Sequence, residues 1–162
     1  MERRDKNNYY LDIAEEVSHR CTCLRRHYGA VIVRDDEIIS TGYVGAPRRR
    51  KNCTDIKSCV REEKKIARGE RYELCRSVHA EANAIISASR KDMLGGTLYM
   101  TGIDMNTGTY IENATSCLMC KRLIINAGIA KVVVRDSNDS YRVIDVDDWI
   151  QNDDSLENVF GY

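Results

Sequence analysis

The sequence predicts a three-layer α/β/α domain, an α/β fold whose mixed sheet begins with an antiparallel hairpin. Three observations support this fold class. Apolar residues recur at helical spacing in three segments, and short β-branched runs lie between these segments. The predicted order is helix, hairpin, helix, strand, helix, strand. Strands that are joined through helices need helices on both faces of the sheet.

Apolar residues at the i, i+3, i+4 and i+7 positions predict a first helix over roughly 7–20; they are Tyr10, Ile13, Ala14 and Val17. Two strands, at 30–33 and 38–42, flank a polar turn and predict a hairpin. Residues 43–76 show no sustained period and contain the only proline, Pro47. A loop of this length inside a compact domain is usually functional or anchored by something.

The second half of the chain is predicted to contain a helix over roughly 79–90, a strand at 97–101, a polar loop at 102–116, a helix at about 117–127 and a strand at 131–134. The first of these helices has an apolar face of Ala82, Ile85 and Ile86, and the second has one of Cys120, Leu123, Ile124 and Ala127. Gly128 suits a helix C-terminus. The tail from Asp136 is acidic and weakly patterned, with a short helical turn at 147–150.

Composition narrows the possible functions. The chain has 162 residues with 25 basic and 25 acidic side chains, so no global charge favours duplex nucleic acid or an anionic membrane. The first residues are charged, and no apolar run approaches the length of about 20 residues that a membrane span needs. We therefore expect one domain spanning 1–162 in the cytoplasm. Seven cysteines without a secretion signal favour metal binding or catalysis over a disulfide framework.

Two short motifs carry the chemistry, and each stands at the predicted start of a helix. His79-Ala80-Glu81 opens one helix, and Cys117-Leu118-Met119-Cys120 opens the next. A helix N-terminus favours thiolates over thiols. One imidazole and two thiolates provide three ligands for Zn²⁺, and catalytic zinc sites leave the fourth position to water. We predict a catalytic zinc site of His79, Cys117 and Cys120.

Glu81 is placed to lie beside this metal without binding it, where it can pass protons from water to a leaving amine. The zinc deaminases have the pattern H-x-E followed by P-C-x-x-C. Here Ser116 stands where that pattern has proline, a change that affects loop stiffness rather than metal binding. A redox role for the two cysteines would leave His79 and Glu81 unexplained.

With these motifs, the chain resembles the cytidine and deoxycytidylate deaminase superfamily, and within it the deoxycytidylate (dCMP) deaminases. The resemblance runs from about residue 8 to 135. Further blocks that carry it are Cys21-Thr22-Cys23, Gly29-Ala30-Val31-Ile32-Val33, Ser40-Thr41-Gly42-Tyr43, Gly45-Ala46-Pro47, Asn52-Cys53, Cys75-Arg76 and Ile124-Ile125-Asn126-Ala127-Gly128-Ile129.

The resemblance implies a five-stranded sheet, conversion of dCMP to dUMP and ammonia, and assembly into homo-oligomers, often hexamers. It also implies a substrate contact by the main-chain N–H of Ala80. The family typically has an asparagine that contacts the sugar where this chain has Val44, next to Gly45. We assign both positions to substrate binding. Because valine cannot form a polar sugar contact, the exact substrate stays open.

A second departure is the segment 102–115, which looks like an insertion close enough to the zinc ligands to roof the pocket. The remaining cysteines suggest a second, structural zinc, which dCMP deaminases often carry. By resemblance, Cys23 and Cys53 match two of its ligand positions, and Cys59 and Cys75 are candidates to complete a four-thiolate site. The alternative is that these cysteines are reduced and pack as small apolar groups.

A substrate 5′-phosphate needs cationic or N–H donors near the mouth of the site. We assign this role to Arg26 and Arg48; Arg49 and Arg50 are equally well explained as a solvated basic loop. Three other functions stay open: a deaminase of a modified cytidine nucleotide or another amino-heterocycle, a non-catalytic zinc-stabilised regulatory module, and a deaminase of nucleic acid. Glu81 argues against the second, and the neutral charge and few aromatic residues argue against the third.

Overall fold

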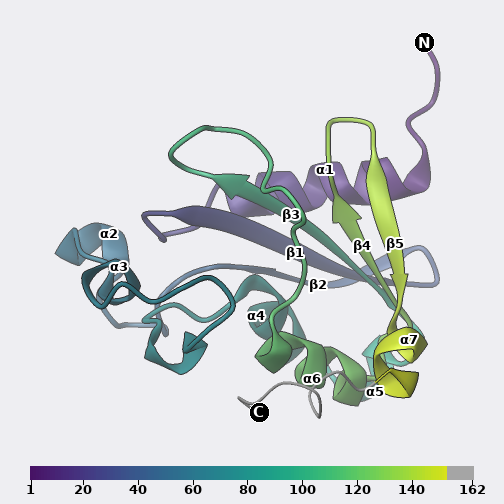
Figure 1. Ribbon diagram of the computed structural model, residues 1–162. Coiled ribbons are helices and arrows are strands. Elements are labelled where there is room, and N and C mark those ends of the chain that lie inside the picture. The colour runs from purple at the N-terminus through teal and green to yellow at the C-terminus, as the bar shows by residue number, and fades with distance from the viewer. Residues whose placement is uncertain (153–162) are drawn as a thin grey trace.

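The computed structural model describes residues 1–152 and is built around a mixed five-stranded sheet in the order β2-β1-β3-β4-β5 (Figure 1). The strands are β1 (Arg26–Arg34), β2 (Glu37–Tyr43), β3 (Thr97–Asp104), β4 (Lys131–Arg135) and β5 (Tyr141–Asp145). β3 and β4 are parallel, and the other neighbouring pairs are antiparallel. This confirms the predicted mixed sheet and its opening hairpin.

Helices cover both faces of the sheet, as Figure 1 shows. They are α1 (Lys6–Ser18), α2 (Cys53–Ile56), α3 (Val60–Glu63), the 3₁₀ turn η1 (Tyr72–Leu74), α4 (Ala80–Ile86), α5 (Arg90–Met93), α6 (Leu118–Ala127) and α7 (Val146–Gln151). On one face, α1 packs Leu11 and Ala14 against Val31 of β1. On the other, α4 and α6 bury Ala84 and Ile124. The three-layer α/β/α architecture is confirmed.

Two local features explain how the hairpin and α4 fit together. Asp35 and Asp36 both adopt left-handed backbone angles, with φ of 51° and 65°, as a two-residue hairpin turn requires. At Gly42 a side chain would lie 2.2 Å from the Ala80 main-chain oxygen. The absence of a side chain at this position therefore lets the first turn of α4 lie directly on β2.

The second half of the chain corrects three predictions. The helix predicted over 79–90 ends at Ile86, because Ser89 caps a separate short helix, α5. Ile86 and Leu123, predicted to be buried, are 73% and 43% exposed. The weakly patterned tail contains β5, an edge strand that pairs with β4. The short helical turn predicted at 147–150 is confirmed as part of α7.

The long segment 43–76 begins with Tyr43, the last residue of β2, and then contains α2, α3 and η1 but no further strand of the sheet. Arg61, which is 5% exposed, organises its second half by donating to the main-chain oxygens of Ala67, Glu70 and Arg71. This loop is therefore anchored by one buried guanidinium rather than by a large apolar core. Within residues 1–152, no helix combines the length and apolar character that a membrane crossing requires.

Candidate active site

The predicted metal ligands meet at the starts of two neighbouring helices. His79 is the N-cap of α4 and Cys117 is the N-cap of α6. The His79 Nδ1 atom lies 3.4 Å from Cys117 Sγ and 3.5 Å from Cys120 Sγ. Within residues 1–152, this is the one group of three or more His, Cys, Asp or Glu side chains whose ligand atoms all lie within 4.8 Å of one another.

This donor set fits zinc. Zn–S and Zn–N bonds of about 2.3 and 2.05 Å at a tetrahedral angle place nitrogen and sulfur about 3.5 Å apart, which matches the two observed separations. Two of the three side chains, Cys120 and His79, also hold protons that a divalent cation would displace. The hydrogen bond with Cys120 lowers the pKa of Cys117 to about 4, and the same bond raises the pKa of Cys120. Despite burial, hydrogen bonds to Cys117 and Cys75 raise the pKa of His79 to about 10.

Glu81 lies in the first turn of α4 and is 4% exposed. Burial raises the pKa of its carboxyl group, with His79 acting in the opposite direction. A buried carboxyl group with a raised pKa can hold a proton and release it near neutral pH. Glu81 therefore combines the position and the chemistry of a proton-transfer group beside the metal ligands.

A cavity of about 310 Å³ opens in front of these groups. His79, Glu81 and Cys117 line the cavity, and Cys120 is buried next to His79. We name these four residues the inner end. The lining also includes Arg25, Arg68 and Tyr72, which we name the outer wall. Among the described residues that line the cavity, Glu81 is the only carboxylate, whereas five side chains are cationic: Arg25, Arg26, Arg61, Arg68 and Lys121. The cavity therefore suits an anionic ligand.

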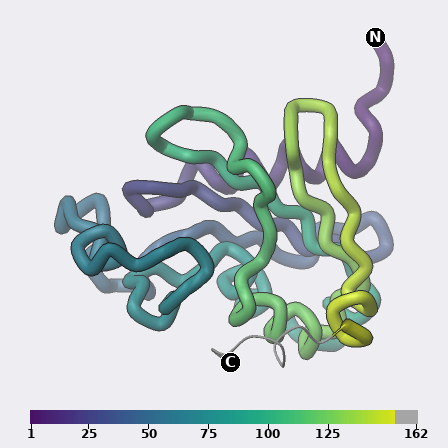
Figure 2. Tube along the Cα trace, in the orientation of Figure 1, coloured from purple at the N-terminus to yellow at the C-terminus, as the bar shows by residue number. Residues whose placement is uncertain are grey.

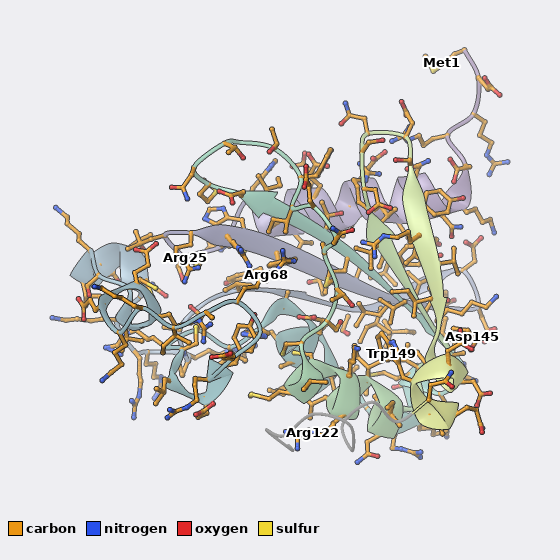
Figure 3. All side chains as sticks on the ribbon, viewed as in Figure 1. Met1, Arg25, Arg68, Arg122, Asp145 and Trp149 are labelled. Carbon is orange, nitrogen blue, oxygen red and sulfur yellow. The ribbon has the colours of Figure 1, made fainter. Side chains whose placement is uncertain are left out.

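The outer wall joins two segments that are far apart in the sequence. Figure 2 shows the loop after α3 approaching the connection between β3 and α6. Arg68 crosses between them and donates to the main-chain oxygens of Glu112 and Asn113 at 3.3 to 3.4 Å. Arg25, which is labelled with Arg68 in Figure 3, pairs with Glu62 at 3.3 Å. These long contacts leave both guanidinium groups able to turn toward a bound anion.

Tyr72 links the outer wall to the inner end. Its ring packs edge-on against the His79 ring at 5.1 Å, and the Arg61 guanidinium lies 4.4 Å from its ring centre. The loop anchored by Arg61 thus also packs against a predicted metal ligand.

Comparison with a protein-family model shows the family of the chain. The model of the cytidine and deoxycytidylate deaminase zinc-binding region matches residues 4–136. The chain belongs to this family.

Individual members of this family are also similar to the chain in sequence. Deoxycytidylate deaminase of Mycobacterium phage D29 is 35% identical over 138 residues, which are 82% of this chain and 96% of that protein. Deoxycytidylate deaminase of Schizosaccharomyces pombe is 30% identical over 81% of this chain, but the match spans 37% of that longer protein.

Solved structures show the same deaminase fold. The dCMP deaminase of cyanophage S-TIM5 has a TM-score of 0.58 at 24% identity, covering 83% of this chain and 85% of its own. The cytidine deaminase of Burkholderia pseudomallei has a TM-score of 0.56 at 14% identity, covering 89% and 95%.

The structure of this deaminase-family chain places the predicted substrate residues unequally. Arg26 and Val44 line the cavity. Gly45 and Ala80 are buried next to lining residues but do not line it, and Ala80 stands at the helix start, where N–H groups lack a helical acceptor. Arg48 is exposed outside the cavity lining. Of the insertion 102–115, only Thr115 lines the cavity, because the segment extends β3 and turns back through an Ile103–Tyr110 bridge.

The four cysteines of the predicted second site gather beside the first. Cys23, Cys59 and Cys75 line the cavity, and all three add to the effect of burial in raising the pKa of Cys53. They do not form a ligand cluster of the tightness seen at His79. All seven cysteines have free thiols in the structure.

Sequence reasoning missed the outer wall. Neither Arg68 nor Tyr72 belongs to a motif, and both lie in the segment without periodicity. Of the outer-wall residues, Arg25 alone had a signal in the sequence: it stands next to Arg26, and two adjacent arginines at the start of a strand indicate a positively charged strand end. Lys121 faces the cavity because it lies one turn after Cys117 on α6.

Proposed function

We propose that this chain catalyses the hydrolytic deamination of dCMP to dUMP and ammonia. The observation that carries the proposal is the buried Glu81 beside His79, Cys117 and Cys120 at the inner end of a cationic cavity. Relatives that are named deoxycytidylate deaminases support the choice of substrate. The acidic phosphate of dCMP suits the cations of the outer wall.

Zinc held by His79, Cys117 and Cys120 would supply a water molecule that is acidic enough to act as a nucleophile near neutral pH. Glu81 carries the protons. Its carboxyl group protonates the ring nitrogen N3, which makes C4 electrophilic, and then takes a proton from the attacking water. It passes this proton to the amine so that ammonia leaves, and it is protonated again when the new C4 hydroxyl becomes the carbonyl. Water supplies the oxygen and the hydrogens, so that the reaction balances without an oxidant or reductant.

At the outer end, we assign the 5′-phosphate to Arg26 together with Arg68 and Arg25. Arg26 makes no side-chain hydrogen bond or ion pair within residues 1–152, so its guanidinium is available. Arg48, predicted for the same role, lies in an exposed turn outside the lining. We therefore transfer the expected phosphate contact from Arg48 to Arg68.

A second candidate keeps the chemistry and changes the sugar or base: a modified cytidine nucleotide or another amino-heterocycle. Val44 favours it. This side chain lines the cavity, and its main-chain N–H and C=O are already bonded to Tyr28 and Thr22. Position 44 thus offers a sugar only an apolar contact.

The number of zinc ions is a further proposal. The gathering of Cys23, Cys53, Cys59 and Cys75 supports a structural zinc that would draw their sulfurs together and anchor the loop 43–76. Zinc content of two per chain, falling to one in Cys53→Ser, is expected. One zinc per wild-type chain would reject this site. We also propose that the enzyme works in the cytoplasm as a homo-oligomer, with the hexamer that the family resemblance implies as the expected form.

The test is ammonia release by the zinc-loaded protein with dCMP, CMP, dCTP, 5-methyl-dCMP and dAMP. We expect dCMP to be the preferred substrate. Preference for another cytosine nucleotide would select the second candidate, and no ammonia from any of them would reject both.

A further inference from the structure

Ser116 carries a buried hydroxyl group that the proton transfers proposed above do not use. The residue is 2% exposed, directly precedes Cys117 and lines the cavity beside Glu81. Its Oγ atom has no hydrogen-bond partner among the described residues. Burying a hydroxyl without a partner costs free energy, and native structures rarely tolerate it unless a ligand or function explains it.

A candidate partner in the free protein is Glu81. The hydroxyl contributes to lowering the pKa of this carboxyl group, after the larger effects of burial and His79. The two groups nevertheless fall short of hydrogen-bond geometry. Ser116 therefore keeps both a donor and an acceptor at the inner end.

The substrate of the proposed reaction brings a matching group to this point. Its exocyclic amine has two N–H donors, and Glu81, which must protonate that nitrogen, can accept from only one side of it. The other N–H needs an acceptor. The zinc deaminase pattern has proline before its first cysteine, and proline has no side-chain acceptor, whereas a serine hydroxyl accepts and donates.

We propose that Ser116 is a substrate-contacting residue whose Oγ accepts a hydrogen bond from the exocyclic amine. The same oxygen then faces the nitrogen as it gains a proton and departs as ammonia. This inference rests on the proposed deaminase function and adds a side chain that hydrogen-bonds to the leaving group.

The test compares Ser116→Ala with Ser40→Ala in the zinc-loaded protein. Ser40 is a matched control because it is also buried, at 8% exposed, but its hydroxyl donates to the Ala84 main-chain oxygen outside the cavity. Two quantities are measured: kcat/KM for dCMP, and Ki for the corresponding pyrimidin-2-one nucleotide, which lacks the exocyclic amine.

We expect Ser116→Ala to lower kcat/KM about ten-fold and to change Ki less than about two-fold. Ser40→Ala should leave both unchanged. The melting temperature of free Ser116→Ala should equal or exceed that of the wild type, since no protein partner is lost, whereas Ser40→Ala should melt lower. A Ki that weakens as much as kcat/KM falls would overturn the assignment, and so would an unchanged kcat/KM or a lower melting temperature for Ser116→Ala.

Failure of the parent proposal would look different. A wild-type protein that keeps zinc and releases no ammonia from dCMP would reject the deaminase function, and the Ser116 contact with it. Normal wild-type turnover with an unaffected Ser116→Ala would reject only the contact.

Discussion

At the inner end of the cavity, the groups to which we assign the reaction stand on the first residues of two helices, whereas the outer wall includes a loop that depends on main-chain contacts. His79 and Cys117 are N-caps on elements packed into the core. Arg68 lies in an exposed part of the loop and reaches across to carbonyl oxygens of another connection. The difference suggests a rigid end that performs the reaction and an adjustable wall that selects the substrate.

The largest expected effect is at the inner end. Glu81→Gln keeps the size of the side chain but cannot shuttle protons. Turnover should therefore fall by about 10² to 10⁴-fold while the zinc content stays at the wild-type value. Ammonia release and metal analysis measure both. Glu37→Gln, on an exposed position of β2, is the control and should be fully active. Activity of Glu81→Gln close to that of the wild type would remove the carboxylate from the mechanism.

The next effect concerns the metal. Cys120→Ala removes one of three ligands, so the variant should lose the zinc of the inner end and nearly all activity. Treatment of the wild-type protein with a chelator should likewise remove this zinc and abolish activity, and added Zn²⁺ should restore the activity. Cys21→Ser is the control, because Cys21 is buried outside the ligand group and its thiol donates to the Tyr28 main-chain oxygen. Retention of full activity by a zinc-free Cys120→Ala protein would contradict the metal assignment.

Arg68→Ala tests the outer wall. If this guanidinium binds the phosphate, KM for dCMP should rise about ten-fold with little change in kcat. Arg48→Ala, at an exposed position outside the cavity, should leave both constants unchanged. The reverse result, a raised KM for Arg48→Ala alone, would return the phosphate contact to the residue that the sequence suggested.

The smallest catalytic effect is expected at the anchor between the two regions. Arg61→Ala leaves three main-chain oxygens without their donor and removes the stack on Tyr72. The melting temperature should fall by roughly 4–10 °C, and KM should rise a few-fold. Arg61→Lys should not rescue, because a single ammonium cannot span the same fork of acceptors. A fall in kcat with unchanged stability would show that the inner end depends on this loop more than proposed.

The same comparison explains what could be predicted from the sequence. The inner end is encoded locally: H-A-E and C-L-M-C place their side chains by helix geometry alone, and both predicted helix starts are confirmed. The alternation of helical segments and β-branched runs was likewise enough to predict the three layers and the central strands of the sheet.

The features that were missed depend on tertiary partners. β5 has only weak patterning, because as an edge strand its formation relies on pairing with β4. Arg61 and Arg68 have no distinctive neighbours in the sequence, and their roles come from carbonyl oxygens that are brought to them by the fold. Ile86 has the spacing of a core residue, but α4 ends there and the side chain faces outward.

The most direct test of the account is the ratio of kcat/KM for dCMP to that for deoxycytidine, which has the same base and sugar without the phosphate. A cationic outer wall acting with a zinc-dependent inner end predicts rapid ammonia release from dCMP and a preference over deoxycytidine of at least about 100-fold. Equal values for the two would contradict the role of the wall, and no ammonia from dCMP would contradict the central claim.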